Sequence, residues 1–75
     1  MEQAEEFVRQ GKAWAEAGEY ARAEAAYRKA LSLCEAGSRS REAYDLCLTL
    51  AELNMEQGNM HGADVWYVRA LEHKK

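Results

Sequence analysis

The chain has 75 residues and a formal net charge of −3; 31% of its residues are charged and 48% are hydrophobic. A chain of this length forms one domain and buries only about 60% of the surface that its unfolded form exposes. Acidic and basic residues are interleaved, so the chain lacks the basic stripe of a nucleic-acid-binding protein, and no long apolar run indicates a membrane span. We therefore expect no nucleic-acid partner and no membrane partner.

The composition favours helix, because proline is absent and alanine, glutamate, leucine and arginine are abundant. We expect an all-α fold. Cys34 and Cys47 are too few for a disulfide scaffold and lack the spacing of metal ligands. We interpret them as buried apolar residues in a reducing compartment, with a redox or disulfide role as the alternative. The N-terminal segment MEQAEEFVRQ is acidic and amphipathic, unlike a secretory signal or a basic transit peptide, so we expect a cytoplasmic protein.

Two helices are predicted in the first half of the chain. The first covers about residues 2–17, where Phe7, Gly11 and Trp14 recur at helical spacing and Gly18 ends the helix. Glycine inside a helix costs about 1 kcal/mol relative to alanine, so Gly11 indicates a place where another backbone comes very close. The second covers about residues 20–36, and one of its faces predicts close packing against a neighbouring helix. That face consists of Ala23, Tyr27, Ala30, Leu31 and Cys34.

Two more helices are predicted after residues 37–40, which form the only loop of any length. Ser38 or Ser40 is expected to cap the third helix. This helix, at about residues 40–57, is apolar on most sides and is expected to be central. Gly58 and Asn59 end it, and a fourth helix covers about residues 60–72. Because short turns place consecutive helices antiparallel, we expect two helical hairpins stacked on each other.

The second half of the chain repeats the first at a distance of forty residues. The matched pairs are Gly18 and Gly58, Ala23 and Ala63, Tyr27 and Tyr67, Ala30 and Ala70, and Leu31 and Leu71. Together with Phe7, Gly11 and Trp14, this pattern resembles the tetratricopeptide repeat (TPR) family. Three aromatic positions are lost in the second copy, where Cys47 replaces Phe7, Asn54 replaces Trp14 and Met60 replaces Tyr20.

The resemblance implies one domain, residues 1–75, with two repeats at about residues 4–37 and 40–74. The usual period of the family is about 34 residues, so the two repeats here are long. We expect the extra residues to lengthen the second helix and the loop that follows it.

Members of the TPR family are typically interaction modules that hold a peptide or a partner helix on a concave face. The resemblance therefore implies a protein-binding scaffold or adaptor with a groove lined by the first helix of each hairpin. The groove positions are Glu5, Val8, Arg9, Lys12 and Glu16 in the first hairpin and Asp45, Leu48, Thr49, Glu52 and Glu56 in the second. The family's lysine and asparagine clamp on a peptide carboxylate is not evident, since acidic residues face Arg9 and Lys12. A solvated face of mixed charge without a ligand is the alternative.

No pattern indicates catalysis or a cofactor. The chain has no glycine-rich phosphate loop and no nucleophile motif. His61 and Asp64 are three residues apart on one helix, but no further ligand follows on that face, so we expect no metal site. We therefore expect a protein that is not an enzyme.

The fourth helix leaves an apolar edge that a further repeat would cover in a longer array. The candidate interface residues are Val65, Trp66, Val68 and Leu71. Because Trp66 neighbours Tyr67, which is expected in the core, Trp66 either packs against the third helix or forms an exposed interface anchor. Two further interpretations of the chain therefore stay open beside the binding module: a homo-oligomer that pairs through this edge, or a fragment or engineered piece of a longer array.

Overall fold

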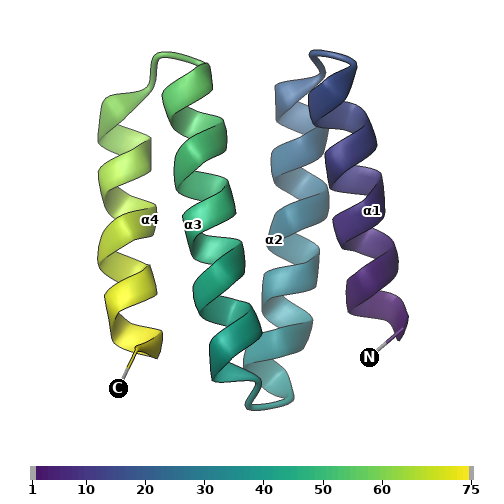
Figure 1. Ribbon diagram of the computed structural model, residues 1–75, viewed down its shortest axis with the longest axis vertical. Helices are drawn as coiled ribbons and strands as arrows, with labels where there is room; N and C mark the ends of the chain where they lie inside the picture. Colours follow the sequence, from purple (N-terminus) through teal and green to yellow (C-terminus); the bar gives the residue numbers. More distant parts are fainter. Residues whose placement is uncertain (1, 75) are drawn as a thin grey trace.

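Four α-helices lie side by side in chain order and run alternately up and down (Figure 1). The computed structural model describes residues 2–74, and the helices are α1 (Glu2–Glu16), α2 (Tyr20–Ala36), α3 (Ser40–Glu56) and α4 (Met60–His73). Helix α1 packs against α2 and α3 packs against α4, while contacts between α2 and α3 join the two hairpins. The predicted all-α class and pair of stacked hairpins are confirmed, and each predicted helix boundary lies within one residue of the observed one.

All three turns have the same length and the same backbone path. The middle residue of each turn has a positive φ, which is +80° at Gly18, 59° at Ser38 and +79° at Gly58. In each turn a backbone N–H donates to a carbonyl oxygen five residues earlier at 2.8 Å, from Glu19 to Trp14, from Arg39 to Cys34 and from Asn59 to Asn54. This bond satisfies a carbonyl group that the end of the helix would otherwise leave unpaired. The prediction of a longer loop at residues 37–40 is therefore wrong, because the forty-residue period consists of two equal helix-turn units.

The expected serine cap of the third helix is also wrong. Arg39 is the N-cap residue of α3, and no side-chain cap hydrogen bond is present there. Ser38 takes the left-handed conformation that closes the turn, and Ser40 is already the first helical residue. At the start of α4, by contrast, the side chain of Asn59 accepts a hydrogen bond from the backbone N–H of Gly62.

The hydrophobic core is centred on α3, as its apolar composition predicts. Leu50 and Cys47 are its largest fully buried side chains, and α3 contacts α2 on one side and α4 on the other. The buried face of α2 is the predicted set of small residues and one aromatic, with Ala26 added. Small side chains at these positions let α2 lie close to its neighbouring helices. The larger buried side chains of α3 then fill the remaining space between the two hairpins.

The close contact at Gly11 is made by a side chain, not by the neighbouring backbone as predicted. A Cβ atom at Gly11 would lie 2.8–2.9 Å from three ring carbons of Tyr27. The absence of a side chain at Gly11 therefore makes room for a buried aromatic ring. The equivalent position in the second hairpin is Ala51, whose methyl group would occupy that room, and the equivalent ring of Tyr67 does not take the same place.

The expected core position of Tyr67 is wrong, and of the two alternatives left open for Trp66 the structure shows the buried one. Trp66 belongs to the core, with 7% of its surface exposed, whereas Tyr67 is 38% exposed and donates a hydrogen bond to the sulfur of Met55. The guanidinium groups of Arg28 on α2 and Arg69 on α4 lie 5.8 and 5.6 Å from the centroid of the Trp66 ring. Trp66 thus packs on the side of α4 that is near α2, where cation–π contacts add to its burial. It is not an exposed anchor.

An ion-pair cluster ties α4 to α2. Glu35 accepts hydrogen bonds from Arg69 at 2.9 Å and lies 2.8 Å from Nε2 of His73. Burial alone would raise the pKa of Glu35, but the hydrogen bonds from Arg69 and His73 outweigh it and hold the pKa below its usual value. The cluster therefore favours the charged carboxylate and helps to fix the second hairpin against the first.

Candidate functional site

Helices α1 and α3 leave a groove between them, and part of α2 forms its base. The groove encloses about 450 Å³, which lies within the range of about 300–1,000 Å³ typical of small-ligand pockets. It is lined by Ala4, Glu5, Val8, Arg9, Lys12, Cys34, Arg39, Glu42, Asp45, Leu46 and Thr49. Two helices of different hairpins and the turn between the hairpins thus build one surface.

The floor of the groove is apolar and made largely of small side chains. Ala4, Cys34 and Leu46 are only 5%, 2% and 7% exposed, and Val8 is half-buried beside them. Burial raises the pKa of the Cys34 thiol, which keeps this side chain uncharged and suited to an apolar floor. Because alanine and cysteine occupy little volume, the surface is hollow between the two helices.

The two rims of the groove differ in charge. The α1 rim carries the cationic side chains of Arg9 and Lys12 together with Glu5, whereas the α3 rim carries Glu42 and Asp45 together with Arg39. The lining side chains of the α1 rim therefore have a net positive charge and those of the α3 rim a net negative charge. Such an arrangement orients a bound chain that carries charges of both signs.

The ion pairs at the rims form within one side of the groove and do not cross it. Arg9 pairs with Glu6 on the same helix, and Arg39 lies 3.5 Å from Glu42 three residues further along the chain. The hydrogen bond from Arg9 lowers the pKa of Glu6 and the same bond raises the pKa of Arg9, so both groups stay charged. Among the side chains of residues 3–74, no salt bridge joins α1 to α3. The space between the rims is therefore left to solvent or to a ligand.

Most of the predicted groove residues lie on this surface. Six of them line the groove, namely Glu5, Val8, Arg9, Lys12, Asp45 and Thr49. Leu48 packs against the core and Glu52 is exposed elsewhere on α3; neither lines the groove, and Glu16 and Glu56 do not either. The predicted set of groove residues extends toward the C-terminal ends of α1 and α3, whereas the observed groove lies closer to the turn between α2 and α3.

Sequence reasoning missed the residues that form the floor and one end of the groove. These are Ala4, Cys34, Leu46, Arg39 and Glu42. The sequence pattern gives Ala4 no role, and it predicts Leu46 as part of the apolar third helix and Cys34 as part of the packing face of the second helix. The signal that identifies Arg39 and Glu42 is the turn at residues 37–39, which places the first turn of α3 beside α1.

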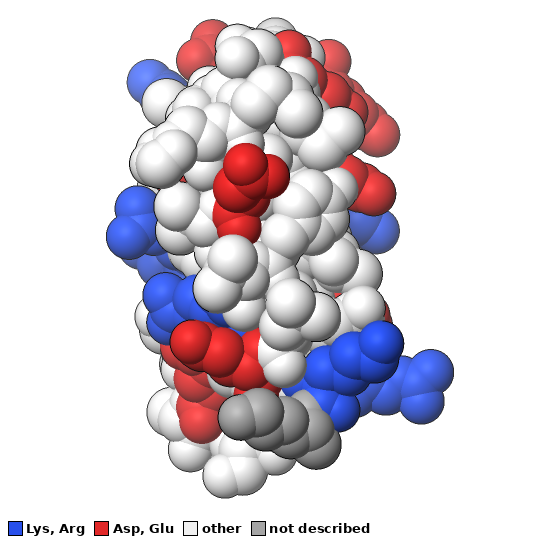
Figure 2. Space-filling view, turned by 90° about the vertical axis from the view of Figure 1, so that its left-hand side faces the viewer, with Lys and Arg blue, Asp and Glu red and all other residues white. Residues whose placement is uncertain are grey.

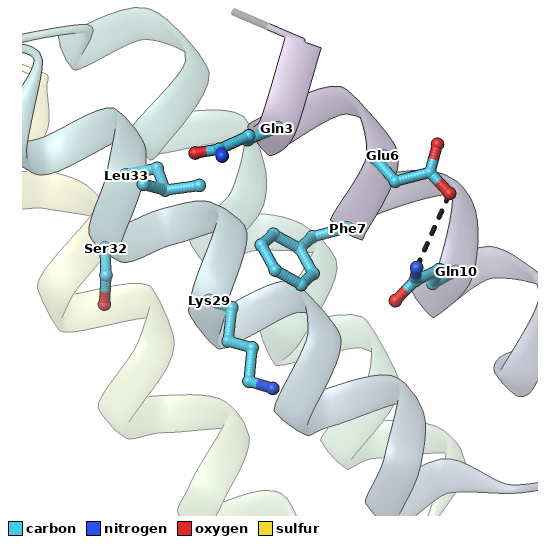
Figure 3. A pocket seen from close by; sticks show the side chains of 7 residues that line it. All are labelled: Gln3, Glu6, Phe7, Gln10, Lys29, Ser32 and Leu33. Atoms are coloured by element: carbon cyan, nitrogen blue, oxygen red, sulfur yellow. Dashed lines mark hydrogen bonds between the residues drawn. The ribbon is translucent and has the colours of Figure 1, made fainter.

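A second hollow lies at the outer edge of the first hairpin, and Figure 3 shows its lining. Phe7 points from α1 toward Lys29 and Leu33 of α2, and the ammonium group of Lys29 lies 5.6 Å from the centroid of the Phe7 ring. Gln10 donates a hydrogen bond to Glu6 on the rim. The hollow encloses about 480 Å³, but only one hairpin builds it. Its walls are long side chains that already contact each other, so it is the weaker candidate.

Metal ligands are not gathered in the described structure. Among residues 2–74, no three His, Cys, Asp or Glu side chains lie together as a metal site requires. His61 and Asp64 are both exposed on α4. Across the same range, no helix combines the length and the apolar character needed to cross a membrane.

Comparison with known proteins adds no relative from which a role can be transferred. No family model matches the chain, and neither a curated protein nor a solved structure matches it significantly. The functional argument therefore rests on the groove and on the helix edges themselves.

Proposed function

We propose that this chain is a non-enzymatic binding module that holds a peptide or a helix of a partner protein in the groove between α1 and α3. The observation that carries the proposal is the hollow apolar floor between rims of unlike charge. The resemblance to TPR proteins supports the same surface, because their concave face is lined by the first helix of each hairpin. We place this binding in the cytoplasm, where a reducing environment keeps Cys34 and Cys47 as the free thiols observed.

The chemistry of the groove defines the segment that fits it. Apolar side chains of the ligand contact Val8 and the small residues of the floor. Acidic side chains flank that apolar stripe on the side of Arg9 and Lys12, and basic side chains flank it on the side of Asp45. Burial of the apolar stripe supplies affinity, while the charges fix the direction of the bound segment and exclude segments with the reverse pattern.

The test is a selection from a random-peptide display library on the immobilised chain, followed by calorimetric titration of the enriched peptides. Enriched peptides are expected to combine apolar residues with acidic residues. The double variant Arg9→Ala/Lys12→Ala is expected to weaken their binding about tenfold or more, which corresponds to about 1.4 kcal/mol. Val8→Glu is expected to abolish it, since a carboxylate would then lie against the apolar floor.

Arg41→Ala supplies the matched control. Arg41 is an exposed cation on α3 that does not line the groove, so its loss changes the net charge without changing the site. Equal losses of affinity for this control and for the groove variants would contradict the proposal, as would a failure of the library to yield any enriched sequence.

A further inference from the structure

The outward face of α4 carries several large apolar side chains that are not covered by another helix. Met60, Tyr67 and Leu71 are 58%, 38% and 61% exposed, and Val68 beside them is 60% exposed. Figure 2 looks onto this side and shows a broad uncharged surface with an acidic side chain near its middle and charged groups mostly around its margin. We call the stripe Met60, Asp64, Tyr67, Leu71 and Lys74 the α4 edge. Its spacing of four, three, four and three residues is that of a helix–helix seam.

The α4 edge is the repeat equivalent of a surface that is covered inside this molecule. Subtraction of the forty-residue period maps it onto Tyr20, Glu24, Tyr27, Leu31 and Cys34 of α2. On α2, Tyr27, Leu31 and Cys34 are 4%, 2% and 2% exposed. The ring of Tyr27 lies against Gly11 of α1, and α2 also packs against α3. The α4 edge therefore has the spacing of a face that other helices cover, and a helix is the occupant that it fits.

Head-to-tail stacking of a second copy does not supply that helix. The residues of α1 that correspond to the buried Ala43, Leu46, Leu50 and Leu53 of α3 are Gln3, Glu6, Gln10 and Ala13. All four of these α1 positions are exposed. Docking α1 of one copy on the α4 edge of another would bury Glu6 and Gln10 against Tyr67 and Leu71, and burial of polar groups without partners is costly.

We propose that the α4 edge pairs with the α4 edge of a second copy of this chain, with the two helices antiparallel. Antiparallel pairing centred near Arg69 places Asp64 of each copy opposite Lys74 of the other. The same register places Tyr67 opposite Leu71, so these two apolar side chains of each copy form the centre between the two ion pairs. Met60 lies outside the ion pairs, at the outer end of the seam, and does not face a residue of the other copy. With the described side chains of residues 3–74, neither Asp64 nor Lys74 forms a salt bridge within its own molecule.

Charge decides the direction of the helices. A parallel pair would place Asp64 beside Asp64 and Lys74 beside Lys74, and like charges in contact oppose association. The antiparallel pair is isologous, so it closes as a dimer and does not grow into a filament. One helix from each copy forms a small interface, and such interfaces are weak or transient. The dimer is therefore expected at micromolar concentrations or above, and the groove between α1 and α3 stays open in it.

The test combines light scattering after size exclusion, over a range of concentrations in reductant, with charge reversal at the two ends of the seam. The unmodified chain is expected to show twice the mass of one chain at high concentration. Asp64→Lys alone and Lys74→Asp alone are each expected to raise the dimer dissociation constant at least tenfold. The double variant Asp64→Lys/Lys74→Asp is expected to restore it, and an equimolar mixture of the two single variants is expected to form mixed dimers.

Rescue by the double variant distinguishes the antiparallel pair from a parallel pair and from head-to-tail stacking. All substituted positions are exposed, so circular dichroism is expected to show unchanged helix content in every variant. Val65 is a candidate interface residue in the sequence pattern, but it is exposed and lies outside the seam as defined here. Val65→Lys is therefore the matched control and is expected to leave the dissociation constant within about threefold. A chain that stays monomeric at all concentrations would overturn the proposal, and so would a dimer whose single charge reversals are not rescued by the double variant.

Discussion

The side-chain amide of Asn59 donates a hydrogen bond to the buried amide oxygen of Asn54, with 3.0 Å between Nδ2 and Oδ1. Asn54 is only 4% exposed, and its own amide donates to the carbonyl oxygen of Leu50 at 2.8 Å. The oxygen of Asn59 accepts in turn from the backbone N–H of Gly62. This chain of three hydrogen bonds joins the end of α3 to the start of α4 and leaves no buried amide atom without a partner.

The first hairpin uses different chemistry at the same three positions. Forty residues earlier, the guanidinium group of Arg22 lies 4.9 Å from the centroid of the Trp14 ring, and Arg22 pairs with Glu19 at 3.9 Å. Trp14, Glu19 and Arg22 therefore correspond to Asn54, Asn59 and Gly62. The contacts of the first hairpin need the Trp14 ring and the Arg22 guanidinium group, whereas the amide network of the second needs Asn54, Asn59 and the space left by Gly62. All three residues therefore differ between the two hairpins.

We predict that Gly62→Ala and Asn54→Ala are strongly coupled. A Cβ atom at Gly62 would lie 2.5 Å from Oδ1 of Asn54 and 2.6 Å from Nδ2 of Asn59. Gly62→Ala is therefore expected to destabilise the chain by about 1–2 kcal/mol, despite the higher helix propensity of alanine. In the Asn54→Ala background the main obstruction is gone, and Gly62→Ala is expected to be neutral or stabilising.

A double-mutant cycle based on urea unfolding measures this coupling, which is expected to be about 1 kcal/mol or more. Asn54→Ala alone is expected to cost about 1–2 kcal/mol through the lost buried hydrogen bonds. Additive effects of the two substitutions would show that the amide network does not confine Gly62.

Gly11→Ala is predicted to destabilise the first hairpin. The new Cβ atom would lie 2.8 Å from the ring of Tyr27, which is 4% exposed and has little room to move. Overpacking costs about 1–3 kcal/mol, and because the Tyr27 ring is confined we expect the upper half of this range, which exceeds the gain of about 1 kcal/mol in helix propensity. Thermal unfolding is expected to show a Tm lower by several degrees. Ala25→Gly at an exposed site of α2 measures the propensity difference alone, and a Tm increase for Gly11→Ala would refute the packing argument.

The turn between α2 and α3 is predicted to gain stability when its glycine is moved by one residue. Ser38 holds a φ of 59°, whereas Gly37 has an ordinary φ of −89°. A left-handed conformation costs a residue with a side chain about 1 kcal/mol, and glycine pays no such cost. The double variant Gly37→Ser/Ser38→Gly is therefore expected to raise stability by about 1 kcal/mol.

A shift of about 4–8 °C in Tm accompanies that change in a domain of this size. Gly18→Ser, which makes the opposite change at a φ of +80°, is the matched control and is expected to lower Tm. Equal Tm values for the unmodified chain and the double variant would show that Ser38 carries no strain.

Periodicity predicted the helices well because each helix buries a regular face and ends at the same kind of turn. It did not predict which residue in a turn takes the positive φ, since Gly37 and Ser38 are adjacent and glycine suggests the wrong one. The different burial of Tyr27 and Tyr67, which occupy equivalent positions of the repeat, was also hidden. Tyr27 packs against Gly11, whereas the residue equivalent to Gly11 in the second hairpin is Ala51, and no further helix covers α4 among the described residues. In the groove, most charged residues of the rims could be predicted from their positions along the helices. The residues of the floor could not, because they are brought together by packing between two hairpins that are distant in sequence.

The cluster around Glu35 makes a prediction about acid stability. Because the folded-state pKa of Glu35 is lowered, the unfolded chain binds more protons in the acid range and stability there rises with pH. The contribution of the carboxylate is present in full above the ordinary pKa of 4.5 and is lost as pH falls through the lowered folded value. Glu35→Gln is therefore expected to cost about 1 kcal/mol at neutral pH and nothing in strong acid.

Urea unfolding of the unmodified chain and of Glu35→Gln at a series of pH values measures the difference directly. Glu24→Gln is the matched control, because Glu24 pairs with Arg28 at 3.8 Å within one helix and such pairs contribute only about 0.2–0.5 kcal/mol. Of these two glutamates, Glu35 alone pairs with residues of α4, so only its replacement is expected to speed hydrogen exchange along α4 at neutral pH. A stability difference that stays constant from neutral pH to strong acid would mean that the Glu35 carboxylate does not stabilise the contact between the hairpins.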